Sequence, residues 1–280
     1  MSAEKREPVK PINIREVFLK KNPKLAKKLP GFVYRYINRI GHIDEINVLL
    51  ANHGNEMGIE FANSMVKEFN VHQTLIGLEN IPPSGRFIFA SNHPLGGFDS
   101  LLILGNLQRR LGETVTLVND LLMNIPQLRP VFVPLNKHGG HPREVLKQLH
   151  DTYSSDKQIL IFPAGLASRM IKGKVQDLTW KKHFITKAIE YQRDVIPVHV
   201  SGRNSNFFYR LGRLRSFFRI PWNLEMFYLA DETFSHKNQN FTITFGKPIS
   251  YKHFDHSKTP DQWAAEVRKM VYRLPNEADN

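Results

Sequence analysis

Residues 87–111 read FIFASNHPLGGFDSLLILGNLQRRL, and they join a short apolar run, a turn and a long periodic run. Phe87–Ala90 follows the turn-forming residues 82–85, which predicts a strand. Ser100–Leu111 predicts a helix. Between them lies a turn that contains Pro94 and two glycines. In an open α/β sheet, such a turn at the carboxyl end of a strand is where ligands bind.

The alternation of strand and helix continues along the chain. The sequence predicts further strands at 74–78, 115–118, 131–134, 158–162, 195–200 and 241–245. It predicts further helices at 142–153, 179–191 and 260–274, the last with Thr259 as N-cap. This order favours an α/β fold, with a mostly parallel sheet flanked by helices.

The first part of the chain has a different character. Residues 1–12 are polar and predict a flexible arm, whereas residues 13–70 lack strand-like alternation and predict helices. One of these helices should cover Met57–Phe69. We therefore expect an N-terminal helical lobe over residues 1–70 and an α/β domain over residues 71–280.

The composition points to an anionic partner. The 280 residues carry a formal net charge of +13 and no cysteine, so disulfides and thiolate chemistry are excluded. The partner could be nucleic acid, anionic lipid headgroups or an acidic carrier, although a merely solvated basic surface gives the same balance. No apolar run approaches the length of a membrane span and no signal peptide is apparent, so we expect a peripheral protein in the cytoplasm.

Two segments could contact a membrane. Residues 1–40 hold 11 Lys or Arg against 3 Glu, interleaved with apolar residues. Residues 203–222 combine arginines with aromatic residues and contain no acid. Arginine with aromatics suits a lipid headgroup boundary, but it also suits stacking on nucleic-acid bases. The plain alternative is a helix with aromatics in the core and arginines in water.

The turn within 87–111 carries the residues best suited to chemistry. Its glycines, Gly96 and Gly97, allow the chain to bend so that Asp99 returns toward His93. A carboxylate on one imidazole nitrogen fixes the tautomer, and the other nitrogen can then accept a proton from a hydroxyl. Asn92 would help to shape the loop. The alternative is that Asp99 caps the following helix and His93 is an ordinary loop residue.

Two later segments could bind an anion. Phe162, Pro163 and Gly165 follow the strand at 158–162, and Arg169 comes shortly after them. Residues 133–143 add Lys137 and Arg143. His138 and His141 in the same turn lack a clear third ligand, so we expect no metal site.

These segments, followed by the Val-Ile-Pro-Val strand at 195–198, resemble in their order the glycerolipid acyltransferase superfamily, which includes the lysophosphatidate acyltransferases. The similarity covers roughly residues 75–250. The His-Pro-Leu-Gly-Gly-Phe-Asp form of the box is similar to a hemolysin-like branch that includes O-acyltransferases of ornithine- and glycine-type aminolipids.

The resemblance implies roles for individual residues. His93 would be the general base and Asp99 would orient it. The acceptor headgroup would be positioned by the middle and third segments, through Lys137, Arg143, Phe162, Pro163, Gly165 and Arg169, with Asn92, Gly96 and Gly97 from the box. The donor would be acyl-CoA or acyl carrier protein, with no other cofactor, and the acceptor a lyso-lipid at an anionic membrane surface, on the inner face of the cell membrane.

The chain departs from the family pattern at two points. Five residues separate His93 from Asp99 instead of four, and Ala164 stands where the family usually has glutamate. The second departure puts the usual glycerol-phosphate acceptor in doubt. We expect an acyltransferase of membrane lipid synthesis acting on a lysophosphatidate-like or lyso-aminolipid acceptor. The alternatives are a basic nucleic-acid-binding protein, for which no motif is present, and a lipid-binding protein or thioesterase on the same fold.

Overall fold

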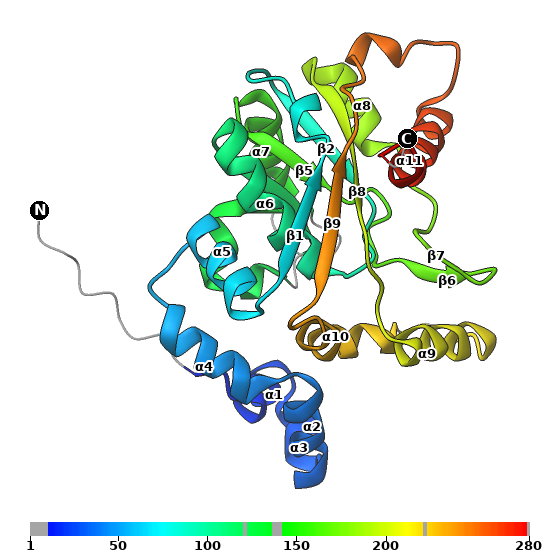
Figure 1. Cartoon of the computed structure of the whole chain (residues 1–280). Helices are drawn as coiled ribbons and strands as arrows, with labels where there is room; N and C mark the ends of the chain where they lie inside the picture. Colours follow the sequence, from blue (N-terminus) through cyan, green and yellow to red (C-terminus); the bar gives the residue numbers. More distant parts are fainter. Residues whose placement is uncertain (1–10, 120–121, 136–141, 221–222, 279–280) are drawn as a thin grey trace, which may run out of the picture.

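The computed structural model describes residues 11–119, 122–135, 142–220 and 223–278. Its main feature is a seven-stranded sheet with the order β1-β9-β8-β2-β5-β3-β4 (Figure 1). The strands are β1 (His72–Ile76), β2 (Phe87–Ser91), β3 (Thr114–Val118), β4 (Phe132–Pro134), β5 (Gln158–Ile161), β8 (Asp194–Val200) and β9 (Asn240–Phe245). A separate hairpin consists of β6 (Arg169–Ile171) and β7 (Lys174–Gln176).

The sheet is parallel at every pairing except β8 with β9. The five strands β8, β2, β5, β3 and β4 consequently have their carboxyl ends at one edge, and the loops that follow them share that edge. The predicted fold class is confirmed, and each predicted strand lies within two residues of the observed one at either end. The hairpin was not predicted.

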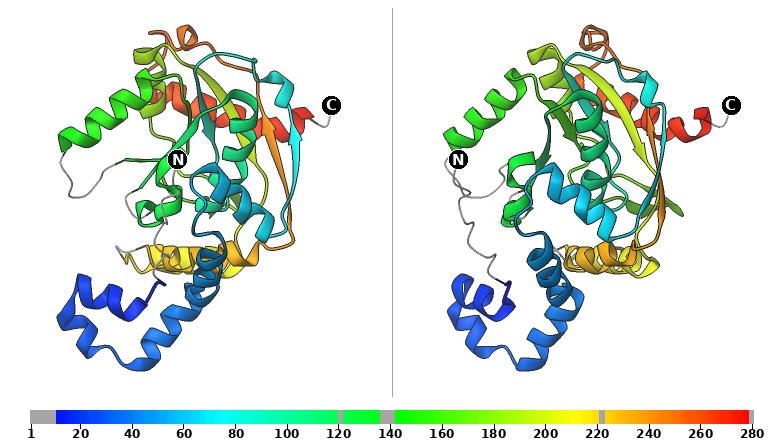
Figure 2. Two further views of the ribbon diagram at one scale, coloured as in Figure 1. Left: turned by 90° about the vertical axis from the view of Figure 1, so that its left-hand side faces the viewer. Right: turned by 60° about the vertical axis from the view of Figure 1, so that its left-hand side comes forward.

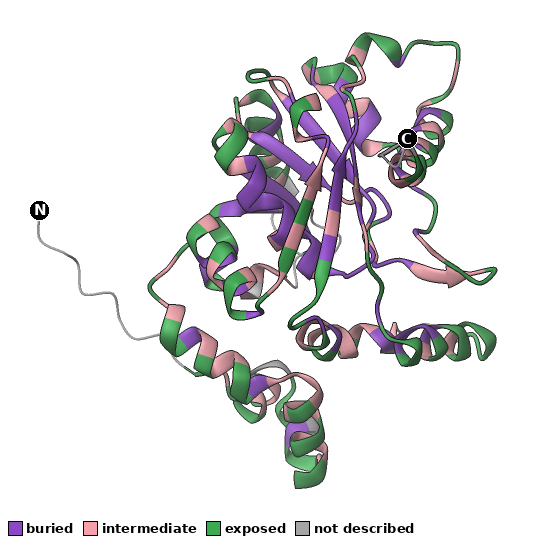
Figure 3. Ribbon diagram, in the orientation of Figure 1, coloured by how far each residue is buried: buried purple, intermediate pink, exposed green. Residues whose placement is uncertain are grey.

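Burial on both faces explains why the central strands are nearly continuous apolar runs. All residues of β2, β3 and β5 are buried (Figure 3). Alternate side chains of β2 enter two different cores, because successive residues of a strand point to opposite faces. Phe87 and Phe89 belong to one core, and Ile88 and Ala90 belong to the other.

Helices cover both faces of the sheet (Figure 2). On one face lie α5 (Ile59–Glu68) and α6 (Gly97–Leu111), and on the other lie α7 (Pro142–Ser154), α8 (His183–Tyr191) and α11 (Pro260–Ala278). Thr259 caps α11 as expected, because its Oγ1 accepts from the Gln262 N–H at 3.3 Å while Gln262 Oε1 accepts from the Thr259 N–H. The observed α8 begins four residues later than predicted.

The N-terminal region is helical, as predicted. It contains α1 (Ile14–Lys21), α2 (Pro23–Lys28), α3 (Gly31–Ile40) and α4 (Ile43–His53), and α2 begins at Pro23, directly after the C-cap residue of α1. The next helix, α5, contributes Phe61 and Met65 to the core shared with the sheet. The division of the chain into two units near residue 70 stays a prediction.

Two helices lie together beyond the sheet, α9 (Asn206–Phe217) and α10 (Leu229–Ser235), joined through the 3-10 turn η4 (Leu224–Tyr228) (Figures 1 and 2). Ser205 caps α9, and its main-chain N–H donates to the buried Glu232 of α10 at 2.6 Å. Within the described residues, no helix is both long and apolar enough to cross a membrane.

Candidate active site

The structure brings His93 and Asp99 together as the sequence predicts. His93 lies in the loop between β2 and α6, and Asp99 lies in the first turn of α6. The distance from His93 Nδ1 to Asp99 Oδ2 is 2.8 Å. The other ring nitrogen, Nε2, has no hydrogen-bond partner among the described residues. The His93 side chain keeps 16% of its surface exposed, whereas that of Asp99 is fully buried.

Burial has a strong effect on Asp99. Desolvation raises the pKa of its carboxyl from the ordinary 3.8 to about 6, with a smaller contribution from the charge of Asp177. The hydrogen bonds from His93 and from the Leu95 N–H act in the opposite direction. At neutral pH the carboxylate is therefore ionised and can hold the Nδ1–H tautomer of His93.

The glycine turn accommodates the additional residue between His93 and Asp99. Gly96 has φ +74°, and a Cβ at this position would lie 3.0 Å from Leu229 Cδ2 of α10. The positive φ favours glycine, and a Cβ would in addition crowd the Leu229 side chain. Gly97 begins α6 in ordinary helical conformation, and a Cβ there would meet nothing closer than 3.8 Å. Of the two glycines, only Gly96 is demanded by the backbone.

The segment after β5 lies beside the imidazole. Because β5 is the parallel neighbour of β2, Phe162 and His93 leave the sheet at the same edge. The Phe162 ring stacks on the His93 ring with centroids 4.2 Å apart and an interplanar angle of 28°. This contact and the Asp99 hydrogen bond together define the plane of the imidazole.

The hairpin β6–β7 holds the main chain of His93 from a third side. The Ser168 N–H donates to the His93 carbonyl at 2.7 Å, and the His93 N–H donates to Asp177 Oδ1 at 3.1 Å. Both main-chain groups of His93 are thus bound by residues at the two ends of the hairpin.

Asp177 is a functional candidate that the sequence did not indicate. Its buried carboxylate also accepts from Ser168 Oγ at 2.5 Å and from Trp180 Nε1 at 2.7 Å. Its main chain is bound by α11, since its N–H donates to the Tyr272 hydroxyl and its carbonyl accepts from Arg268. Asp177 lies 84 positions from His93, so no local spacing pattern could have linked them.

Asn92 turns away from the imidazole and toward the sheet. Its Oδ1 accepts from the Val200 N–H at 2.7 Å, and its Nδ2 donates to the Val200 carbonyl at 2.9 Å. The side chain thus continues the pairing of β2 with β8 beyond the last strand residue.

The other members of the third segment form a tight turn. Pro163 is buried, and Gly165 is exposed with φ +68°. Ala164 packs into the core on the α8 side of the sheet. A glutamate at position 164 would have to enter that core, so this turn offers no acidic group to a substrate.

Arg169 is held by an internal ion pair. Its Nη2 lies 2.9 Å from Oε1 of Glu225, which is fully buried, and Arg215 Nε lies 3.1 Å from Oε2 of the same carboxylate. Burial lowers the pKa of Arg169 from its ordinary value, and Glu225 counteracts the shift. The Arg169 guanidinium is therefore bound inside the protein, although the two guanidiniums and the one carboxylate together keep a net positive charge.

The middle segment is described only in part. Arg143 lies exposed near the beginning of α7, while Lys137, His138 and His141 fall outside the described residues. Within the described part of the chain, no three His, Asp or Glu side chains are grouped so that they could hold a metal ion.

Comparisons with known proteins agree with this arrangement. A family model described as Acyltransferase matches residues 16–280. The chain belongs to this acyltransferase family. Two curated relatives are each called lyso-glycine lipid O-acyltransferase. One, from Bacteroides thetaiotaomicron, is 44% identical over 264 residues, covering 94% of this chain and 97% of the relative. The other, from Phocaeicola vulgatus, is 43% identical over 264 residues, covering 94% and 95%.

The enzyme is also similar to a solved structure. The 1-acyl-sn-glycerophosphate acyltransferase PlsC from Thermotoga maritima is 20% identical with a TM-score of 0.46, and the match covers 86% of this chain and 93% of that one. The predicted superfamily and the prediction of an acyltransferase are confirmed by the family model and the curated relatives.

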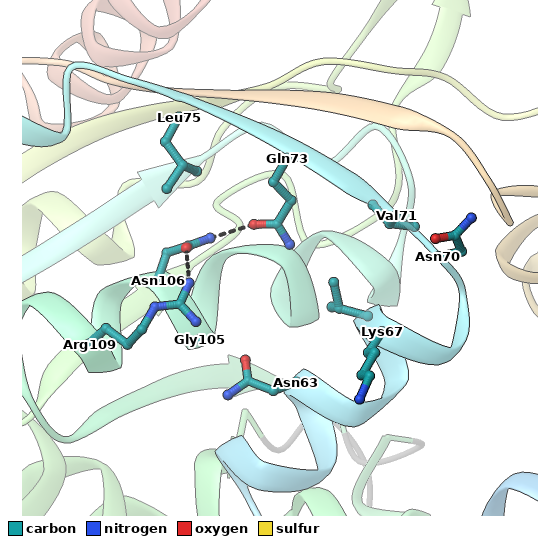
Figure 4. Close-up of a pocket in the computed structure, with 10 residues that line it drawn as sticks. Asn63, Lys67, Asn70, Val71, Gln73, Leu75, Gly105, Asn106 and Arg109 are labelled. Atoms are coloured by element: carbon teal, nitrogen blue, oxygen red, sulfur yellow. Dashed lines mark hydrogen bonds between the residues drawn. The ribbon is translucent and has the colours of Figure 1, made fainter.

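The acyltransferase also has a groove away from His93, between α5, α6 and β1 (Figure 4). Its volume is about 540 Å³, and amide and basic side chains line it, among them Gln73, Asn106 and Arg109. Asn106 donates to Gln73 at 2.6 Å and accepts from Arg109 at 2.5 Å, so these side chains bind one another. None of the predicted site residues lines this groove.

Proposed function

We propose that this acyltransferase moves a fatty acyl group from a thioester to a hydroxyl of a lyso-lipid during membrane lipid synthesis. The observation that carries the proposal is the 2.8 Å contact between His93 and the buried Asp99, which leaves Nε2 available for a proton. The names of the two curated relatives favour a lyso-glycine lipid as the acceptor.

The reaction needs one base and one positioning residue. Nε2 of His93 accepts the proton of the acceptor hydroxyl while its oxygen attacks the thioester carbonyl. Asp99 stabilises the resulting imidazolium through Nδ1–H. When the tetrahedral intermediate collapses, the carbon–sulfur bond breaks and the imidazolium returns the proton to the leaving sulfur. The products are an ester and a free thiol, and no metal or redox cofactor takes part.

The donor in this proposal is acyl-CoA or acyl carrier protein, both of which bring phosphate groups to a basic protein. Arg143 and Lys137 are proposed to meet the anionic substrate groups, with Phe162, Pro163 and Gly165 forming the wall beside His93. Because Glu225 pairs with Arg169, we propose that Arg169 shapes this wall instead of binding phosphate.

A membrane surface is the proposed source of the acceptor. The charge of +13 suits an anionic leaflet, and the inner face of the cell membrane is the proposed location. The N-terminal helices are also suited to contact a membrane, since α3 has no buried residue among those described and exposes Phe32 and Tyr36.

The test is an assay with purified protein, a lyso-glycine lipid and either acyl-CoA or acyl carrier protein. His93→Ala should lower turnover by about two to four orders of magnitude. His256→Ala, which removes an exposed imidazole, is the matched control. Lysophosphatidate as a second acceptor measures headgroup preference. Near-normal transfer by His93→Ala would contradict the mechanism, and release of free fatty acid in place of the ester would show a thioesterase.

A further inference from the structure

The helix α9 has apolar side chains on two opposite faces. Its inner residues Phe208 and Tyr209 are buried against the hairpin β6–β7. On its outer side, Phe207, Leu214 and Phe218 follow the spacing i, i+7 and i+11, which places them on one face. All three are exposed, as is Phe217 at 78%.

The turn η4 extends this outer side. Phe227 of η4 is 68% exposed, and its neighbour Tyr228 contacts the ring of Phe207 with centroids 4.9 Å apart. We call the set Phe207, Leu214, Phe217, Phe218 and Phe227 the α9 outer face. Large side chains gathered in this way on a soluble surface usually mark a binding site.

The exposed charges of α9 and of the turn that ends it are all positive, and the next exposed carboxylate along the chain, Asp231 of α10, is bound to His42 at 2.9 Å. Arg210, Arg213 and Arg219 are exposed, and no carboxylate among the described residues pairs with them. No aspartate or glutamate occurs between Arg203 and Trp222. A second copy of this basic chain would be repelled, whereas an anionic lipid surface would be attracted and could also take up the apolar side chains.

The α9 outer face also lies close to the catalytic loop. On the inner side of α9, Phe208 packs against Ala167, whose neighbour Ser168 donates to the His93 carbonyl. A surface bound to the outside of α9 is therefore separated from the His93 segment by one helix and one extended chain, about 15 Å.

We infer that the α9 outer face docks the enzyme on an anionic bilayer. Phe207, Leu214, Phe217, Phe218 and Phe227 enter the headgroup region while Arg210, Arg213 and Arg219 bind lipid phosphates. The docking places the His93 loop at the bilayer edge, where a lyso-lipid can reach it. Only this last consequence rests on the proposed function.

Vesicle flotation tests the docking directly. The full-length protein is mixed with phosphatidylcholine vesicles that contain or lack phosphatidylglycerol. The triple variant Leu214→Ser, Phe217→Ser, Phe218→Ser should lower the partition coefficient by about tenfold or more. Leu146→Ser with Ile189→Ser, which removes exposed apolar side chains from α7 and α8, is the matched control and should bind as the wild type does.

A second set of variants separates the contribution of the arginine charges from that of the apolar side chains. Changing Arg210, Arg213 and Arg219 to Gln should lower binding to anionic vesicles by about fivefold for each arginine, whereas changing them to Lys should preserve it. Equal binding to neutral and anionic vesicles, or wild-type binding by the triple serine variant, would overturn the inference. So would a change in oligomeric state of the serine variant without lipid, or a DNA oligonucleotide that displaces the vesicles with the same dependence on the α9 residues.

An activity comparison links docking to the reaction. A short-chain, water-soluble lyso-lipid should be acylated equally by the wild type and the serine variant, whereas an acceptor embedded in anionic vesicles should be acylated much more slowly by the variant. If the wild type acylates neither acceptor, the proposed function fails, and flotation still decides the docking. If the serine variant acylates the embedded acceptor at the wild-type rate, the docking inference fails.

Discussion

Replacing Asp99 with asparagine should make the protein more stable and the enzyme much slower. The carboxyl is fully buried, and its pKa of about 6 means that the fold disfavours its charged form. The difference from the ordinary value of 3.8 corresponds to about 3 kcal/mol of unfolding free energy above pH 6. The neutral amide of asparagine has nearly the same shape and carries no such cost.

The raised pKa of Asp99 determines how the stability difference between the two proteins changes with pH. A carboxyl with a raised pKa binds protons more tightly in the folded state, so the wild type loses stability as the pH rises from about 4 to about 6. The asparagine side chain of the variant does not titrate in this pH range. The two proteins should therefore unfold at similar urea concentrations near pH 4, and Asp99→Asn should be more stable by up to about 3 kcal/mol near pH 7.5.

Activity should change in the opposite direction. The neutral amide of the Asp99→Asn variant does not stabilise an imidazolium as a carboxylate does, so turnover should fall by about 10² to 10⁴. Asp151→Asn, which removes an exposed carboxylate on α7, controls for the loss of one charge. A stability difference that is independent of pH, or a variant that is less stable at pH 7.5, would refute this account of Asp99.

Three further predictions concern the surroundings of His93. Gly96→Ala should lower the unfolding free energy by about 2 kcal/mol because of the positive φ, whereas Gly97→Ala should raise it by up to about 1 kcal/mol, as urea titration would show. Asp177→Asn should lower the unfolding free energy by about 1–3 kcal/mol. It should also lower kcat more than it changes KM, because it releases the His93 main chain, and an unchanged kcat would exclude this positioning role. Arg169→Ala should destabilise the protein by about 1–3 kcal/mol in thermal unfolding, because the buried Glu225 loses one of its two guanidinium partners and keeps Arg215; an effect on KM alone would instead indicate substrate binding.

The sequence was most informative where structure and chemistry are local. The strand at 87–91 could be predicted from its apolar residues and the preceding turn. The meeting of His93 with Asp99 could also be predicted, because two glycines and a proline lie between residues only six positions apart. Phe162 could be predicted only to follow its own strand, because the direct pairing of β5 with β2 was not predicted.

The contacts that the sequence did not predict join distant segments. Glu225 lies 56 positions from Arg169, and nothing in either segment indicates that the two side chains meet. From the sequence alone, Arg169 is therefore predicted to bind the acceptor. Asn92 also looked like a loop residue facing the substrate, until its amide was found on Val200, 108 positions away. Such pairs depend on how the strands are ordered in the sheet, which periodicity does not encode.

The main-chain anchor of His93 has a consequence for the newly made protein. The ribosome releases the His-Asp box early, but the hairpin that fixes it comes some eighty residues later. That hairpin in turn depends on Arg268 and Tyr272 in α11, which lie 91 and 95 positions after Asp177. The growing chain therefore contains His93 and Asp99 long before the segments that fix their positions have been made. A fragment truncated ahead of α11 should be inactive although it still contains both residues.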